Sequence, residues 1–143
     1  MKLQLEVVIL AENGDELLDD AARLLHVAPH DSLRQFAAQF GDEVAVLHSA
    51  LSAGERYDSF KKIKTGRARV VIGTRSAVFA PLRELGLIVL DEEQESSYES
   101  GSAPFYHARD IAKYRCAQEG ARLLLGSATP TVETMYYARE GRY

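Results

Sequence analysis

The stretch LIVLDEEQESSYES, residues 87–100, joins an uncharged apolar segment directly to three consecutive acids. Leu87–Leu90 has the character of a short, fully buried strand, and Asp91, Glu92 and Glu93 follow at once. A carboxylate at the end of such a strand can hold Mg²⁺ through water beside the phosphates of a nucleotide, and its neighbour can orient or deprotonate a water. A solvated acidic loop is the simpler alternative, and three acids alone favour it.

Strand and helix patterns alternate along the rest of the chain. Strands are expected at residues 3–10, 44–48, 70–74, 85–90 and 123–126, and helices are expected from Asn13, from Asp31 or Ser32, from Ser52, over residues 106–118, and from Thr129–Pro130. This alternation predicts an α/β fold with a three-layer arrangement, a parallel sheet with helices on both faces. The four strands Val44–His48, Val70–Thr74, Leu87–Leu90 and Leu123–Gly126 are expected to be parallel.

Local signals define the ends and inner faces of these helices. Ser52 and Glu55 have the spacing of a capping box, and Gly66 is expected to end the helix that follows. Pro130 is expected at the first position of the last helix. The residues expected to face inward are Tyr57, Phe60 and Ile63 in one helix and Ile111 and Tyr114 in another.

Three polar clusters follow predicted strands: GTRSA at residues 73–77, DEEQ at 91–94 and GSATP at 126–130. In parallel α/β sheets, ligands bind at the carboxyl ends of the strands. We therefore expect the three clusters to lie along one edge of the sheet.

Composition limits the class of protein. The chain has 143 residues, 46% of them hydrophobic and 27% charged, which fits one globular domain. Its net charge of −4 means that contact with nucleic acid must be local. The single Cys116 excludes a disulfide framework, and the four histidines lack the spacing of metal ligands, so zinc is not expected. No apolar run could span a membrane and no signal-peptide pattern is present, so a cytoplasmic protein is expected.

Residues 36–143 closely resemble the bacterial primosomal replication-restart DNA helicases of superfamily 2. The resemblance rests on three linked stretches: VAVLHSALSAGERYDSFKKIKTGRARVVIGTRSAVFAPLRELGLIVLDEEQESSY at residues 44–98, YHARDIAKYRC at 106–116, and LLLGSATPTVETM at 123–135. It implies an incomplete RecA-like P-loop NTPase lobe, the first motor lobe of such a helicase. Residues 1–35 match less well and are expected to form a divergent strand and helix within the same single domain.

The resemblance also implies roles for the acidic cluster and for GSAT. DEEQ matches the Walker B motif, with Asp91 as the Mg²⁺ carboxylate and Glu92 as the catalytic base. Gln94 stands where the family commonly carries His; Gln can hydrogen-bond across a cleft but does not titrate near neutral pH. The motif that couples ATP hydrolysis to strand separation corresponds to Gly126, Ser127, Ala128 and Thr129.

Forked or single-stranded DNA and other replication-restart proteins are the partners that the resemblance implies. The residues expected near DNA are Thr74, Arg75 and Ser76, and an aromatic-rich loop with Tyr98, Phe105, Tyr106 and Arg109. Aromatic faces can stack on unpaired bases. The alternative is that Phe105 and Tyr106 only pack on the next helix. For Lys61, Lys62 and Lys64 we favour a solvated helix end that complements the helix dipole.

One motif of the family is missing. The sequence has no G-x-x-x-x-G-K-[ST], and no Gly is followed by Lys, so the phosphate-binding loop is absent. The second motor lobe and the cysteines of the family's zinc module are not found either. We expect a truncated or divergent lobe that does not hydrolyse ATP well by itself. The alternative function is a non-enzymatic α/β domain that binds DNA or a protein partner.

The segment Glu95–Pro104 contains four serines and a glycine. Because little apolar surface anchors it, we expect it to be the most mobile internal part of the chain.

Overall fold

The computed structural model describes residues 7–11, 38 and 40–143. The predicted helices that begin at Asn13 and near Asp31 lie outside these residues. The described elements are β1 (Val7–Ala11), η1 (Gly41–Glu43), β2 (Val44–Leu47), α3 (Ala53–Lys64), β3 (Val70–Gly73), η2 (Arg75–Phe79), β4 (Leu85–Leu90), η3 (Ser96–Tyr98), α4 (Ala108–Glu119), β5 (Arg122–Leu125) and α5 (Val132–Arg139).

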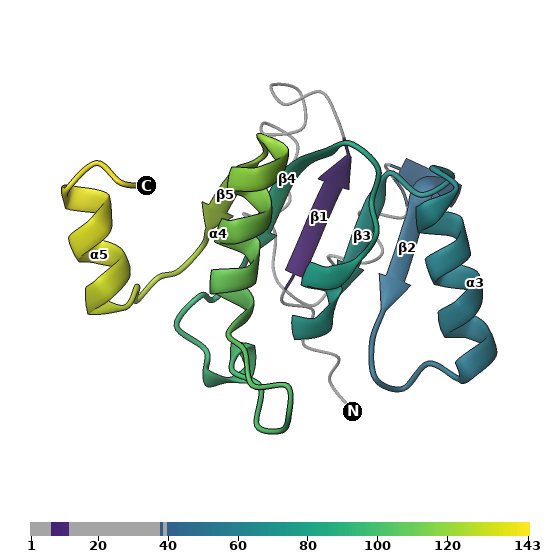
Figure 1. Cartoon of the computed structure of the whole chain (residues 1–143), viewed down its shortest axis with the longest axis horizontal. Coiled ribbons are helices and arrows are strands. Elements are labelled where there is room, and N and C mark those ends of the chain that lie inside the picture. The colour runs from purple at the N-terminus through teal and green to yellow at the C-terminus, as the bar shows by residue number, and fades with distance from the viewer. Residues whose placement is uncertain (1–6, 12–37, 39) are drawn as a thin grey trace.

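The five strands form one sheet in the order β2-β3-β1-β4-β5 (Figure 1). β2 pairs with β3 in parallel, and β4 pairs with β5 in parallel. The central strand β1 is antiparallel to both β3 and β4, so these two run in the same direction. The predicted α/β class and the common direction of the four later strands are therefore confirmed. The sheet is mostly rather than entirely parallel, because an apolar run such as VVILA can pair in either direction.

Both faces of the sheet are buried. Residues of one face, including Ile9, Val71 and Ile88, belong to a continuous core together with Ile63 of α3 and Ala112 of α4. Helices α3 and α4 therefore cover the same face. The residues that alternate to the opposite face in β3 and β4 are buried as well, namely Val70, Ile72, Leu87 and Val89.

Helix α3 begins with the predicted capping box. The Ser52 hydroxyl accepts a hydrogen bond from Glu55 N at 3.3 Å, and the Glu55 carboxylate accepts one from Ser52 N at 2.9 Å. The Ser52 hydroxyl also donates to Glu55 Oε2 at 2.7 Å, and this bond, together with the one from Ser52 N, lowers the pKa of Glu55. The predicted inner face is only partly correct, because Ile63 is buried but Phe60 is 38% exposed and Tyr57 is 67% exposed. Residues three positions apart in a helix are offset by about 60° around its axis. Over the two steps from Ile63 back to Tyr57 this offset accumulates, so Tyr57 lies well away from the buried face.

Helix α4 packs on β4 through small residues. Ala108, Ala112 and Cys116 are buried at a spacing of four, which places them on one side of the helix. Ile111 packs against this core as predicted, but the prediction for Tyr114 is wrong, since it is 66% exposed. Tyr114 lies two positions after Ala112, which is about 200° around the helix, so its side chain points away from the sheet.

The last helix, α5, begins later than the sequence predicts. Thr131 is its cap, with a hydroxyl that accepts a hydrogen bond from Thr134 N at 3.2 Å, and Val132 is the first helical residue. Thr129 and Pro130 lie before the helix because a second threonine provides the capping oxygen. In the part of the chain that the structure describes, no helix is long and apolar enough to cross a membrane.

Candidate functional site

The ends of β2, β3, β4 and β5 lie at one edge of the sheet, called here the carboxyl edge. Register pairs the end of β2 with the end of β3, and the end of β4 with the end of β5. Val7, at the start of β1, pairs with both Gly73 and Leu90 and so joins the two halves at this edge. GTRSA, DEEQ and GSATP therefore leave the sheet along the same edge, in agreement with the arrangement expected from the sequence.

Asp91 is partly buried at the end of β4, and Glu92 next to it is exposed. Burial raises the pKa of Asp91; a hydrogen bond from Glu92 N to Asp91 Oδ1 at 3.0 Å offsets part of this, and the charge of Glu92 adds to it. Glu92 has a φ of 50°, an uncommon left-handed conformation for a residue other than glycine. A Cβ at Gly126 would lie 3.0 Å from Asp91 Oδ1, so the first residue of GSAT directly borders the carboxylate.

Gln94 connects the acidic cluster to GSAT. Its amide nitrogen donates to Glu92 Oε2 at 2.6 Å, and its amide oxygen accepts a hydrogen bond from the Ser127 hydroxyl. The same hydroxyl accepts a hydrogen bond from Thr129 N at 3.0 Å. A continuous chain of hydrogen bonds thus runs from Glu92 through Gln94 and Ser127 to Thr129.

Glu93 has a structural role that the sequence pattern did not reveal. It is 2% exposed, and its carboxylate accepts hydrogen bonds from Thr131 N at 2.8 Å and from Arg109 Nη1 at 3.2 Å. Arg109 also contacts the hydroxyls of Thr131 and Thr134 and pairs with Glu133 at 3.3 Å. This buried pair ties DEEQ to the starts of α4 and α5.

The placement of Arg109 does not support its predicted contact with DNA. The side chain is only 11% exposed and its guanidinium points into the protein. A buried carboxylate needs an opposite charge with hydrogen bonds, and Arg109 supplies both to Glu93. In the sequence, Glu93 is visible as the third acid of DEEQ. Its partner Arg109, 16 positions later, could be identified only from the fold.

Tyr98 is also inside the protein rather than available for stacking. It is fully buried, and its hydroxyl donates to the carbonyl of Asp91. The expectation that Glu95–Pro104 lacks an anchor is therefore wrong for the first half of the segment. Arg75 adds to this anchor, because its guanidinium donates to the carbonyls of Ser97, at 2.9 Å, and of Glu99.

The second half of this loop is exposed. Residues 101–105 all lie at the surface, and Phe105 is 77% exposed. Tyr106 is half-buried and packs edge-on against Phe79, with ring centroids 5.0 Å apart, while the Arg75 guanidinium lies 5.8 Å from its ring. Among the residues predicted to touch DNA, Ser76 and Phe105 are thus the exposed ones, whereas Thr74 and Arg75 are half-buried.

Helix α4 starts beside this loop. The cap is His107, whose Nδ1 accepts a hydrogen bond from Arg109 N at 3.2 Å. Burial and the nearby charge of Arg109 lower the pKa of His107, which keeps the ring neutral and able to accept this bond. Further along α4, burial raises the pKa of the Cys116 thiol to about 11, as suits a buried apolar residue rather than a nucleophile.

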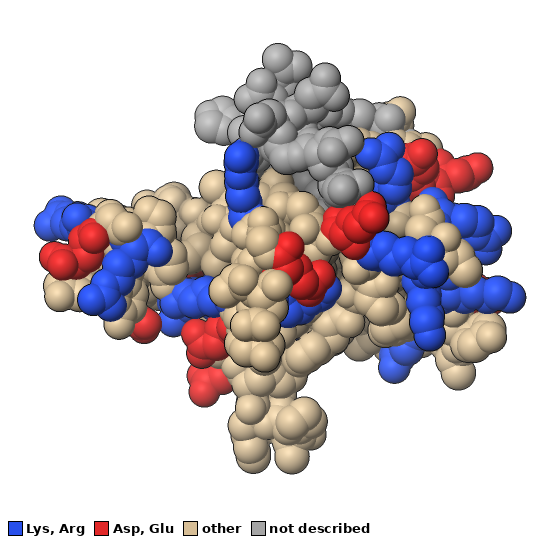
Figure 2. Space-filling model, turned by 45° about the horizontal axis from the view of Figure 1, so that its top comes forward, with Lys and Arg blue, Asp and Glu red and all other residues tan. Residues whose placement is uncertain are grey.

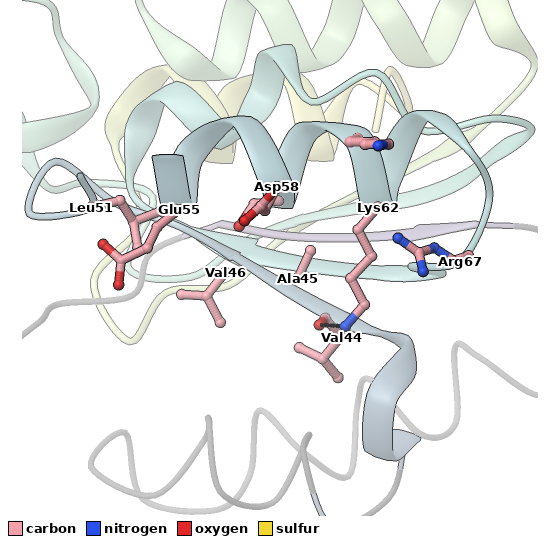
Figure 3. A pocket seen from close by; sticks show the side chains of 10 residues that line it. Val44, Ala45, Val46, Leu51, Glu55, Asp58, Lys62 and Arg67 are labelled. Atoms are coloured by element: carbon pink, nitrogen blue, oxygen red, sulfur yellow. Dashed lines mark hydrogen bonds between the residues drawn. The ribbon is translucent and has the colours of Figure 1, made fainter. Parts of the chain in front are cut away.

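Basic side chains gather over the α3 side of the molecule (Figure 2). Lys61 and Lys64 are exposed, as expected for a solvated helix end. Lys62 differs, because its ammonium donates to the carbonyl of Val44 at 2.9 Å and ties α3 to the edge strand β2 (Figure 3). Over the described residues, no group of three or more His, Cys, Asp or Glu side chains could hold a metal.

Comparison with known proteins identifies similar sequences. The DEAD/DEAH box helicase family matches residues 7–136. The chain is 49% identical over 112 residues to the replication restart protein PriA of Treponema pallidum. This match covers 78% of this chain and 17% of that protein. It is 47% identical over 140 residues to PriA of Bacillus subtilis, and this match covers 94% of this chain and 17% of that protein. PriA of Haemophilus influenzae is 35% identical over 134 residues, and this match covers 90% of this chain and 18% of that protein. The chain thus spans less than a fifth of the length of these relatives.

Proposed function

Because the chain belongs to the DEAD/DEAH box helicase family, we propose that it is the part of a replication-restart helicase motor that links a hydrolytic site to DNA. The observation that supports this most directly is the hydrogen-bonded path from Glu92 through Gln94 to Ser127. It joins the acidic cluster to GSAT, the two motifs that the family uses for hydrolysis and coupling. A non-enzymatic domain would not need this chain of hydrogen bonds between two motifs at the edge of the sheet.

The acidic cluster fits Mg²⁺ of the kind that the family uses. Asp91 and Glu92 offer hard carboxylate oxygens, and Asp91 is partly buried while Glu92 is open to solvent. Bound there, Mg²⁺ would neutralise phosphate charge. Asp91 would hold the ion through water, and Glu92 would accept a proton from a water. Gln94 keeps the Glu92 carboxylate in position with its 2.6 Å hydrogen bond.

A triphosphate does not fit the described residues in the same way. The sequence contains no glycine-rich phosphate loop with its lysine. In addition, β1 runs antiparallel to its neighbours, so its last residue, Ala11, lies at the edge opposite Asp91. We infer that ATP turnover requires groups outside the described residues.

Contact with single-stranded DNA is the part of the proposed function that does not depend on ATP turnover and can be tested on this chain alone. Ser76 and Phe105 are exposed near Arg75 and Tyr106, which connect η2 to the loop after DEEQ. Hydroxyls contact phosphates, and an exposed phenyl ring can stack on a base.

Fluorescence anisotropy with a labelled oligothymidylate tests this proposal on the purified chain. We expect binding that weakens as salt increases, because phosphate contacts release counterions. Phe105→Ala should weaken binding about fivefold or more, the equivalent of one stacked base. Tyr114→Ala is the control, since Tyr114 is also exposed but lies on α4. If the unmodified chain shows no binding at low salt, the proposal is overturned.

A further inference from the structure

A hollow of about 370 Å³ opens at the carboxyl edge, where β2 ends, between α3 and η2. We propose that it is a subsite for one unpaired nucleobase of single-stranded DNA. This inference rests on the proposed function and adds residues outside the three polar clusters. Those that carry the argument are Leu47, His48, Arg56, Phe60, Ser76 and Phe79.

Aromatic and apolar side chains form much of the hollow. Phe60 is 38% exposed and Phe79 is 48% exposed, so each ring keeps open surface, while Leu47 is buried beneath. Phe79 is held by its edge-on contact with Tyr106 at 5.0 Å. A ring that is already ordered loses little entropy when a base stacks on it. The volume lies within the range of about 300–1,000 Å³ that is usual for small-molecule sites.

His48 and Ser76 provide hydrogen-bonding groups at this apolar surface. His48 Nδ1 accepts a hydrogen bond from Ala50 N at 3.2 Å, so in the neutral ring the proton resides on Nε2. That N–H is a donor for a ring nitrogen or a carbonyl oxygen, and every base carries at least one acceptor of these two kinds. Ser76 is exposed at the same hollow and can act as donor or acceptor.

Charge distinguishes this hollow from its neighbour. Arg56 lies at its rim and is exposed, no acidic residue lines it, and within the described residues the Arg56 guanidinium makes no ion pair. It is therefore available to a DNA phosphate. The hollow between α3 and β2, of about 470 Å³, is instead lined by Glu55 and Asp58 as well as basic residues (Figure 3). Those carboxylates make it a poor place for a polyanion.

The hollow also continues the segment proposed to contact DNA. Ser76 and Phe79 both belong to η2, which starts with Arg75, and Phe79 touches Tyr106 beyond it. A strand whose backbone passes Ser76 would bring a base over Phe79 and the adjoining phosphate toward Arg56.

The test compares an oligothymidylate with an abasic oligonucleotide of the same length, which keeps the phosphates but has no bases. The variant Phe60→Leu/Phe79→Leu preserves apolar bulk and removes the aromatic faces. We expect it to bind the oligothymidylate about tenfold more weakly, and the abasic strand as the unmodified chain does. Tyr57→Leu is the matched control, because Tyr57 is an exposed aromatic residue of the same helix that does not line the hollow.

A second measurement reports on the hollow directly. The chain contains no tryptophan, so Phe79→Trp places a single indole there. We expect oligothymidylate to quench its fluorescence strongly and the abasic strand to do so weakly. If the double leucine variant keeps the full preference for bases and Phe79→Trp is not quenched, the subsite is wrong while the proposed function stands. If the unmodified chain binds neither strand, both are wrong.

Discussion

The Ser127 hydroxyl donates a hydrogen bond to the side-chain carbonyl of Gln94, 33 positions earlier in the chain. The same amide donates to Glu92, so one neutral side chain connects the carboxylate to GSAT. Gln94 can do this because an amide carries a donor and an acceptor at once. An amide does not titrate, so this connection is expected to be independent of pH between about 5 and 8, where a histidine would change charge.

Gln94→Ala should lower the free energy of unfolding by about 1 kcal/mol, since two hydrogen bonds are lost and exposed Glu92 can be solvated instead. Urea unfolding followed by circular dichroism measures this. Gln118→Ala, at an exposed position near the end of α4, is the control and should change stability by less than about 0.5 kcal/mol. Equal effects in the two variants would show that the Gln94 bridge does not form.

Breaking the buried Glu93–Arg109 pair should be far more costly. Arg109→Met leaves the 2%-exposed Glu93 carboxylate without its opposite charge, and we expect a loss of about 3–5 kcal/mol. The comparison is Arg69→Met, which breaks a half-exposed pair with Glu43 and should cost less than about 1 kcal/mol. The double variant Glu93→Gln/Arg109→Met should be less destabilised than Arg109→Met, because no unpaired charge stays buried. If its loss of unfolding free energy equals the sum of the losses in Glu93→Gln and Arg109→Met, direct pairing is contradicted.

Asp91→Asn should stabilise the protein at neutral pH. The pKa of Asp91 in the folded chain is raised from 3.8, so the folded state favours the protonated acid and its ionisation costs stability. The stability associated with this group is fully present below about pH 3.8 and is lost as pH rises through the raised pKa. The difference between variant and parent, from urea unfolding at several pH values, should therefore grow with pH. Asp42→Asn, at an exposed site, is the control, and a pH-independent difference for Asp91→Asn would contradict the prediction.

Tyr98→Ala should destabilise the chain by about 3–5 kcal/mol, because it removes a fully buried ring and the hydroxyl bonded to the Asp91 carbonyl. Tyr114→Ala, at a 66% exposed position, should have little effect. Hydrogen exchange should show that Tyr98→Ala also increases opening of residues 95–100. Retained protection in that segment would mean that Arg75, rather than Tyr98, is its main anchor.

MgATP should bind this chain only in the millimolar range or more weakly, about −4 kcal/mol at best, because no phosphate loop is present in the sequence. Isothermal titration calorimetry measures this directly. Asp91→Asn/Glu92→Gln, which lacks the carboxylates for Mg²⁺, is the matched variant and should bind no more tightly. Micromolar affinity of the parent chain would reveal a phosphate site of another kind.

Local sequence determined the class of fold and the position of the candidate site. A short apolar run that stops at charged residues, such as Leu87–Leu90, favours a buried strand, and polar clusters that follow parallel strands meet at one edge of the sheet. The capping box of Ser52 and Glu55 was equally readable, because both partners lie within one turn.

Tertiary structure alone decided the direction of β1, the burial of Tyr98, and the pairing of Arg109 with Glu93. A strand pattern has the same period of two in either direction, so it does not specify orientation. The surroundings of an aromatic or charged side chain depend on segments many positions away. For Glu93 and Arg109 the deciding cause was the cost of burying an unpaired charge, and that cost exists only once the chain has folded around it.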